Sequence, residues 1–153
     1  MKLILLTVAA ALMILAIPFP AKASLGGDIT SVRADKARLQ GTLQATKNGV
    51  YTVEEVKAPT GLLLREYVSS NGQVFAVTWQ GPTRPDLQQV LGTYFTTFTQ
   101  AVQAARGHRI GRGPLVIKRP GLVVEMAGHM RWLVGRVYVP SMVPPEVQME
   151  EIR

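Results

Sequence analysis

Apolar and polar residues alternate most clearly on the two sides of Asn71-Gly72. Strands joined by Asn-Gly are typical of a β-hairpin, here over residues 62–70 and 73–80. A two-residue turn would place Glu66 opposite Val77 and turn a mostly apolar face toward the core. That face consists of Leu62, Leu64, Val68, Phe75, Val77 and Trp79, with Glu66 among them. The other face, which we expect to meet water more easily, consists of Leu63, Arg65, Tyr67, Ala76 and Thr78.

A first hairpin is predicted around Asn48-Gly49. Strict alternation over residues 36–47 favours a strand there, against a helical alternative based on Ile29, Val32, Leu39 and Leu43. Asp28 is expected to cap only one helical turn. A loop over residues 47–49 pairs Leu43 with Val53, whereas a two-residue turn would oppose Leu43 and Glu54, so we prefer the longer loop.

A helix is predicted from Pro85 to Ala105, because apolar residues recur there at helical spacing. Pro85 suits the first turn, with Thr83 or Arg84 near the cap. Gly92 permits a bend or a close contact within the helix. The apolar stripe, which should pack on a sheet, comprises Leu87, Val90, Leu91, Tyr94, Phe95, Phe98, Ala101, Val102 and Ala105.

Three strand-like stretches follow over residues 115–118, 122–126 and 129–139, with turns expected at 119–121 and 127–128. One short helix is expected from Pro145. The sequence therefore predicts a single α+β domain, in which antiparallel β-hairpins pack against one main amphipathic helix and further strands follow.

The N-terminal residues have the features of a secretory signal peptide. An uncharged apolar run over residues 3–19 follows Lys2, and Ala21-Lys22-Ala23 matches the small-x-small rule for cleavage. We expect cleavage after Ala23, which leaves residues 24–153 as the domain, in the periplasm or outside the cell. The alternative is an uncleaved anchor, which would make the chain a membrane-tethered structural protein.

Composition narrows the classes of partner and chemistry. Without the signal the chain carries 15 basic and 10 acidic residues, a net charge of +5, which favours an envelope protein or an anionic surface as partner. Nucleic acid is not expected for an exported protein, and membrane contact is expected only through the signal segment. The chain has no cysteine and two histidines, so no disulfide, metal site or cofactor is expected.

Glu66 is the main candidate for chemistry, because a carboxylate within an apolar face needs a cationic partner or a raised pKa. Arg84, Arg131 and Arg136 are the candidate partners. The structural interpretation is an ion pair or an edge position that reaches water. The functional one is a ligand-binding or general-acid carboxylate, and an envelope hydrolase would combine Glu66 or Glu55 with His129 or Arg131.

Basic residues supply the candidate binding surface. The segment 106–113, RGHRIGRG, is a basic glycine-rich loop without the spacing of a phosphate-binding loop. A solvated loop and binding to an anionic surface both remain open for it. The candidate binding residues are Arg65, Tyr67, Arg84, Arg106, His108, Arg109, Arg112 and Arg131.

Three strings carry a family resemblance: SLGGD at 24–28, REYVSSNGQVFAVTWQGPTRPDLQQVLGTYF at 65–95 and GHMRWLVGRVYVPSMVP at 128–144. They resemble a family of small exported proteobacterial proteins classed as a domain of unknown function. The resemblance implies export and one compact domain, and it transfers no catalytic or ligand residues. Together with the absence of a nucleophile motif in the expected domain, it favours a non-enzymatic periplasmic or secreted binding or accessory protein.

Overall fold

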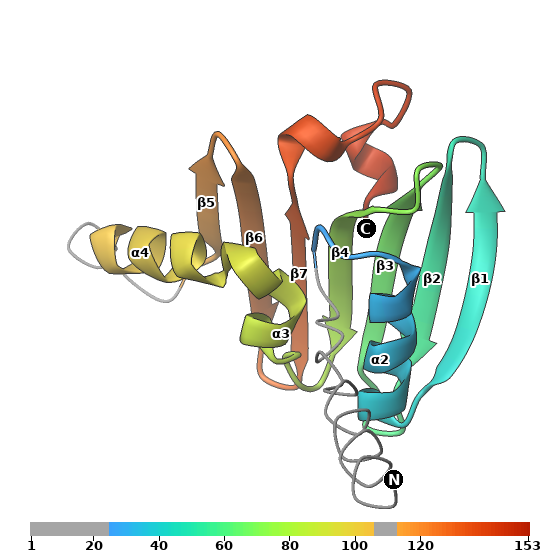
Figure 1. Cartoon of the computed structure of the whole chain (residues 1–153). Coiled ribbons are helices and arrows are strands. Elements are labelled where there is room, and N and C mark those ends of the chain that lie inside the picture. The colour runs from blue at the N-terminus through green and yellow to red at the C-terminus, as the bar shows by residue number, and fades with distance from the viewer. Residues whose placement is uncertain (1–24, 106–112) are drawn as a thin grey trace, which may run out of the picture.

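Seven strands form one antiparallel sheet in the order β1-β2-β3-β4-β7-β6-β5 (Figure 1). The computed structural model describes residues 25–105 and 113–153. The strands are β1 Thr42–Asn48, β2 Tyr51–Lys57, β3 Leu63–Ser69, β4 Val74–Gly81, β5 Leu115–Arg119, β6 Leu122–His129 and β7 Trp132–Tyr138. The helices are α2 Ile29–Leu39, α3 Leu87–Leu91 and α4 Phe95–Ala105, with 3-10 turns at Gly92–Tyr94, Pro140–Met142 and Met149–Glu151.

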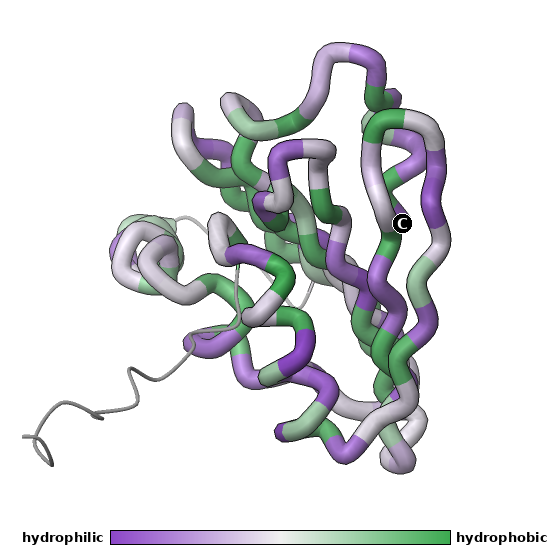
Figure 2. The backbone as a smooth tube through the Cα atoms, turned by 45° about the vertical axis from the view of Figure 1, so that its right-hand side comes forward, coloured by the Kyte–Doolittle hydropathy of each residue, from purple (hydrophilic) through white to green (hydrophobic). Residues whose placement is uncertain are grey.

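The two faces of the sheet are covered differently. The helix face is the side on which α2 lies over β2 and α4 lies over β5 and β6, and Figure 2 shows the helices as a layer beside the sheet. Its core includes Val56, Leu64, Val77 and Trp79 from the strands. The tail face is the opposite side, where residues 140–153 pack on a smaller cluster around Tyr51, Tyr67 and Phe75. The sheet therefore separates two cores.

The mixed α+β class is confirmed, but the single main helix is wrong. The segment 85–105 is broken at Gly92, whose φ of 50° is accessible to glycine. Asp86 is the cap of α3 and accepts hydrogen bonds from the backbone N–H groups of Gln88 and Gln89, so Thr83 and Arg84 lie near the cap, just before it. None of the helices within residues 25–105 and 113–153 is long and apolar enough to cross a membrane.

The strand predicted over residues 36–47 is wrong in its first half, since α2 continues to Leu39. The Asp28 carboxylate accepts from the Thr30 N–H and begins the helix, as expected, but the helix runs well past Val32. Gln40 ends it in the left-handed conformation, with φ 50°. Burial of Val32 and Asp35 against the sheet outweighs the alternation in the sequence.

The first hairpin adopts neither of the two registers considered. Its turn residues are Gly49 and Val50, so Asn48 pairs with Tyr51 and Leu43 pairs with Val56. Gly49 has φ 60° at the first central position, which is the arrangement that a two-residue turn beginning with glycine requires.

The second hairpin is confirmed over most of its length, including Glu66 opposite Val77 and Leu64 opposite Trp79. The pairing shifts after Tyr67, so that Val68 pairs with Val74 and not with Phe75. This bulge moves Phe75 to the tail face, where its ring meets that of Tyr67 at 6.2 Å. The expectation that the Arg65 and Tyr67 face is open to water is also wrong, because Tyr67 is 2% exposed there.

Strands are confirmed in all three C-terminal stretches, with one turn displaced. Gly128 lies inside β6, and the turn between β6 and β7 is formed by Met130 and Arg131. In place of a helix from Pro145, the tail has two single 3-10 turns.

Candidate functional site

A row of polar side chains crosses the tail face on five adjacent strands. Cross-strand pairing aligns Glu55 with Arg65, Arg65 with Thr78, Thr78 with Arg136, and Arg136 with Glu125. The order along the row is therefore Glu, Arg, Thr, Arg, Glu, with the threonine at the centre. Residues paired directly across antiparallel strands point to the same face, which is why five residues distant in sequence meet.

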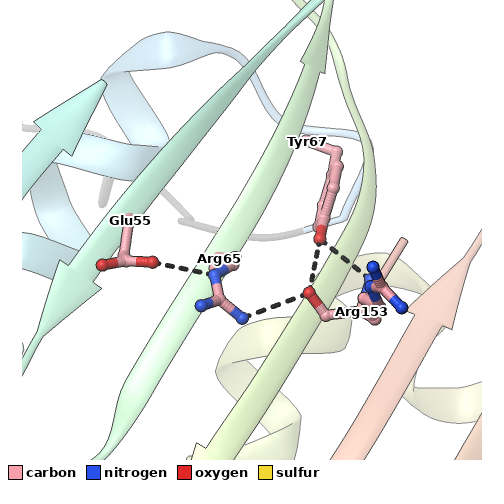
Figure 3. Close-up of polar contacts among 4 residues, drawn as sticks. All are labelled: Glu55, Arg65, Tyr67 and Arg153. Atoms are coloured by element: carbon pink, nitrogen blue, oxygen red, sulfur yellow. Dashed lines mark hydrogen bonds and ion pairs between the residues drawn. The ribbon is translucent and has the colours of Figure 1, made fainter. Parts of the chain in front are cut away.

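Each arginine of the row is held by the glutamate outside it. The Arg65 Nε lies 2.8 Å from Glu55 Oε2, and the Arg136 Nε lies 2.6 Å from Glu125 Oε2. All four side chains are about one quarter to one third exposed. Since the Nε donors face the glutamates, the terminal nitrogens of both guanidinium groups can bind other partners, as Figure 3 shows for Arg65.

The terminal nitrogens of both arginines donate to backbone carbonyls of the tail. Arg65 Nη1 donates to the Arg153 oxygen at 3.1 Å, as Figure 3 shows. Arg136 Nη1 donates to the carbonyl oxygens of Met149 at 3.0 Å and Ile152 at 3.4 Å. The two arginines thus bind the backbone of the tail at and just after its 3-10 turn Met149–Glu151, not its side chains.

Tyr67 and Ile152 fix the tail beside the row. The Tyr67 hydroxyl donates to the Arg153 oxygen at 2.9 Å and accepts from the Arg153 N–H at 3.0 Å. Ile152 is fully buried in the cluster with Tyr51 and Phe75. Burying such a side chain contributes about 1.5–3 kcal/mol, so the tail is anchored by packing as well as by hydrogen bonds.

A groove of about 540 Å³ lies along the tail and over the row. Ile152 and Arg153 line one side, and Pro114 and Val116 line another. Thr78 also lines it; this side chain is 4% exposed, and its hydroxyl has no hydrogen-bond partner among the described residues. A buried hydroxyl without a partner costs free energy, so Thr78 is an unsatisfied polar group at the centre of the row.

The charges of the row decide what the groove can bind. Within the row the two arginines and two glutamates cancel, so the row has donors without a net positive charge of its own, and Arg153 lies beside it in the groove lining. A polyanion gains little from such a site, whereas neutral carbonyl oxygens can accept from the unused guanidinium N–H groups. The exposed apolar side chain of Val116 adds a surface for an apolar group of the same ligand.

Glu66 lies on the other face, fully buried and without a hydrogen-bond partner for either carboxylate oxygen in the described part of the chain. The ion pair expected with Arg84, Arg131 or Arg136 is therefore not formed. Arg136 pairs with Glu125 on the opposite face. Burial, together with the nearby carboxylates of Asp35 and Glu54, raises the pKa of Glu66 to about 8.

Asp35 on α2 shares this environment. Burial raises its pKa to about 6, although Arg38, whose Nη1 lies 2.8 Å from Asp35 Oδ1, opposes the change. Among residues 25–105 and 113–153, no group of three acidic or histidine side chains is arranged to hold a metal ion. Glu66 is thus a protonated side chain at neutral pH, held inside the core.

The residues proposed for hydrolysis do not converge. Glu66 is on the helix face, whereas Glu55 is on the tail face in its pair with Arg65. His129 ends β6 and Arg131 lies in the β6–β7 turn. His129 is five residues along β6 from Val124, which is level with Glu66 across the sheet. The enzyme hypothesis required these groups in one pocket, and the structure does not bring them together.

Other predicted binding residues divide into three sets. Arg65 and Tyr67 belong to the tail face, and Arg84 and Arg131 lie at the end of the sheet where β4 ends and β7 begins. Arg106, His108, Arg109 and Arg112 lie outside the described residues, as does the predicted signal peptide. Sequence reasoning missed Thr78, Glu125 and Arg136 as site residues. Placing the β6–β7 turn at Met130 would have aligned Glu125 with Arg136.

Comparison with known proteins yields one match. The sequence model of the family described as "Protein of unknown function (DUF2844)" matches residues 21–152. No curated protein and no solved structure matches the chain. Because the match spans nearly the whole sequence, the chain belongs to the DUF2844 family of proteins of unknown function.

Proposed function

We propose that the chain is an exported, non-enzymatic binding protein that takes an extended polypeptide segment into the groove on the tail face. The carrying observation is the pair of arginines, each fixed by a glutamate, that donate to the carbonyl oxygens of Met149, Ile152 and Arg153. A donor set built for the chain's own backbone suits the backbone of a partner in the same way.

The groove extends this donor set beyond the tail. Thr78 offers a hydroxyl without a partner among the described residues on its lining, and Val116, which is paired with Glu125 on the edge strand β5, is 53% exposed. A partner segment lying next to residues 152–153 would place carbonyls over the row and an apolar side chain against Val116. The neutral charge balance makes an uncharged backbone a better ligand than a phosphate or a sulfated polymer.

Capture from an envelope extract tests this proposal. The immobilised protein should retain a defined partner, and retention should persist from low to high salt because the row carries no net charge. A photo-reactive residue placed at Val116 should cross-link to that partner, whereas one placed at Val50, which is exposed at the far end of the sheet, should not. Absence of any cross-linked species at Val116 would contradict the proposal.

Thr78→Val provides a variant that separates folding from binding. Valine has the shape of threonine without the hydroxyl, so removing a buried group that has no partner should raise the free energy of unfolding by about 1 kcal/mol. Retention of the partner should fall. Urea unfolding and the capture assay check the two effects, with Thr46→Val on the exposed edge strand β1 as the control. A stabilised variant with unchanged capture would remove Thr78 from the site.

Export is proposed from the N-terminal sequence. If the signal peptide is cleaved after Ala23, the protein recovered from cells should begin at Ser24. N-terminal sequencing of the purified protein, together with fractionation of the cells, checks this. A chain that begins at Met1 and remains with the membrane fraction would instead favour the tethered alternative.

A further inference from the structure

A second cavity, of about 1000 Å³, lies on the helix face between the helices and the strands β4, β5, β6 and β7. This volume is at the upper end of the range found for small-molecule sites. Its walls come from both layers and expose polar and apolar surface in nearly equal amounts. The apolar side chains are Trp79, Leu87, Phe95, Phe98, Val102, Leu115, Met126 and Leu133.

The floor of the cavity is formed by Trp79 lying over Gly135 on the neighbouring strand. A Cβ added to Gly135 would come within 2.1 Å of the indole ring, so the glycine is what lets the ring lie against the sheet. Trp79 is 3% exposed. An aromatic floor of this kind suits an apolar chain, because the ring offers a large apolar surface.

One end of the cavity opens at a basic end of the sheet. Arg84 lines the cavity and is exposed, and Gly81 pairs with Leu133, which places the β6–β7 turn with Arg131 beside it. Neither arginine forms an ion pair with another described residue. The acidic residue nearby, Asp86, is engaged in capping α3. Asp86 also lines the cavity, so this end has two arginines against one nearby carboxylate and keeps an excess of positive charge.

The β6–β7 turn carries exposed apolar side chains next to those cations. Met130 is 92% exposed and Trp132 is 46% exposed, with Arg131 between them. In Figure 1 this turn and the segment between β4 and α3 lie together at the lower end of the sheet. Tryptophan beside arginine is the composition of segments that rest at a membrane interface, where the ring is half buried and the cation meets lipid headgroups.

We propose that this end of the sheet binds an anionic bilayer, with Met130 and Trp132 in the interface, Arg84 and Arg131 at the headgroups, and one acyl chain of an anionic lipid in the cavity over Trp79. The site is separate from the groove on the tail face. It extends membrane contact beyond the signal segment, to which sequence analysis confined it.

A lipid fits the observations better than a protein partner. A stable protein interface buries about 800 Å² on each side, whereas the exposed apolar surface here is confined to the two side chains of a narrow turn. A narrow turn of this kind can enter the headgroup region of a bilayer, because a bilayer does not require a surface of complementary shape. A cavity that has an aromatic floor and an arginine at its mouth also matches a molecule that has one charged end and one apolar chain.

The two tryptophans of the chain make a direct test possible, because Trp79 reports on the cavity and Trp132 reports on the exposed side chains next to the β6–β7 turn. Two variants with the same N-terminus are compared, Trp132→Phe and Trp79→Phe, each of which keeps one tryptophan. Each variant is mixed with vesicles whose lipids carry brominated acyl chains. Vesicles of phosphatidylcholine alone are compared with vesicles in which about one third of the lipid is phosphatidylglycerol. Emission from each remaining tryptophan should be quenched by the anionic vesicles.

Variants locate the binding surface. Replacing Arg84 or Arg131 with alanine should lower the vesicle partition coefficient about fivefold each, and Met130→Asp about tenfold or more. Lys47→Ala and Val50→Asp, at the opposite end of the sheet, serve as controls of charge and of exposed apolar area. Val102→Phe, which fills part of the cavity, should reduce quenching of Trp79 and leave that of Trp132 in place.

Each result of the quenching experiment either supports the proposed lipid site or contradicts it. Quenching of both tryptophans, with losses confined to the variants at the basic end, supports the proposal. Quenching of Trp132 alone contradicts the placement of an acyl chain over Trp79, and quenching of neither overturns the whole site. Equal binding to neutral and anionic vesicles, or equal losses in the Lys47 and Val50 controls, also overturns it. None of these readouts depends on capture of a polypeptide in the tail-face groove.

Discussion

Replacing Glu66 with glutamine is expected to raise the free energy of unfolding at about pH 9 by an amount on the order of 4 kcal/mol. The folded protein holds Glu66 fully buried beside Asp35 and Glu54, without a hydrogen-bond partner among the described residues. Above pH 8 its carboxylate must be charged in that environment. Glutamine keeps the shape of the side chain and removes the charge, so the variant avoids this cost.

The direction of the pH dependence follows from the raised pKa. Glu66 titrates near 4.5 in the unfolded chain and at about 8 in the folded chain, so the folded state binds the extra proton between these values. Stability from this group is complete below the lower value and is lost as the pH rises toward about 8. Asp35, with its pKa raised to about 6, acts in the same direction at lower pH. The wild type should therefore be most stable in mild acid.

Urea unfolding across the pH range measures both effects. The curves for wild type and Glu66→Gln should meet near the pKa of a free carboxyl and separate steadily toward alkaline pH. Glu55→Gln is the matched control, because Glu55 is one third exposed on the tail face and is paired with Arg65. A wild-type stability that stays flat between mild acid and alkaline pH would contradict the buried, unpartnered state of Glu66.

The position of Glu66 illustrates how far the sequence could predict the site. Alternation around Asn71-Gly72 placed it on the apolar face opposite Val77, and the structure confirms this. The partner could not be predicted, because it depended on which strand lies beside β4. That strand is β7, more than fifty residues later, and its pairing turns Arg136 toward Glu125 on the other face.

The wrong prediction of a strand in the second half of α2 has a local cause. Polar and apolar residues alternate over residues 36–47, but a helix that buries only a narrow stripe also tolerates such alternation. Val32 and Asp35, three residues apart, are buried positions of this stripe. The Asp28 cap was the better signal, since a capped turn extends wherever the following residues can bury a stripe. Gly41 marks the true boundary: an added Cβ there would lie 2.7 Å from Val56, so the chain crosses close to β2 at this point.

The bulge in the second hairpin could not be read from the alternation either. A loop of three residues, Ser70 to Gly72, joins Ser69 and Gln73, and Gly72 has φ 82°. The extra residue shifts Phe75 onto the tail face, where the chain's later tail gives it partners. Packing against Ile152, from a segment far away in sequence, accompanies the shift and is invisible in the pattern of the hairpin itself.

Gly128→Ala is expected to lower the free energy of unfolding by roughly 3 kcal/mol or more. Gly128 has φ 151°, a conformation that residues with a side chain rarely adopt. An added Cβ would also lie 2.5 Å from the carbonyl oxygen of Trp132 and 2.9 Å from the Cα of Leu133. Because both atoms belong to the backbone of the neighbouring β7, the collision can be relieved only by moving the strand.

A glycine with the same backbone φ angle also lies on the other side of β7. Leu133 pairs with Gly128 on β6 and with Gly81 on β4, and Gly81 also has φ 151°. Two glycines thus flank the start of β7 at the end of the sheet that carries Trp132.

Gly121→Ala is the control, because Gly121 lies in the β5–β6 turn and no atom is within 4 Å of an added Cβ. This variant should change the free energy of unfolding by no more than about 0.5 kcal/mol. Urea unfolding of the two variants compares them directly, and equal losses would show that the backbone at Gly128 is not constrained. Gly128→Ala should also weaken vesicle binding under conditions where it remains folded, because moving the start of β7 displaces Trp132 from the basic end of the sheet.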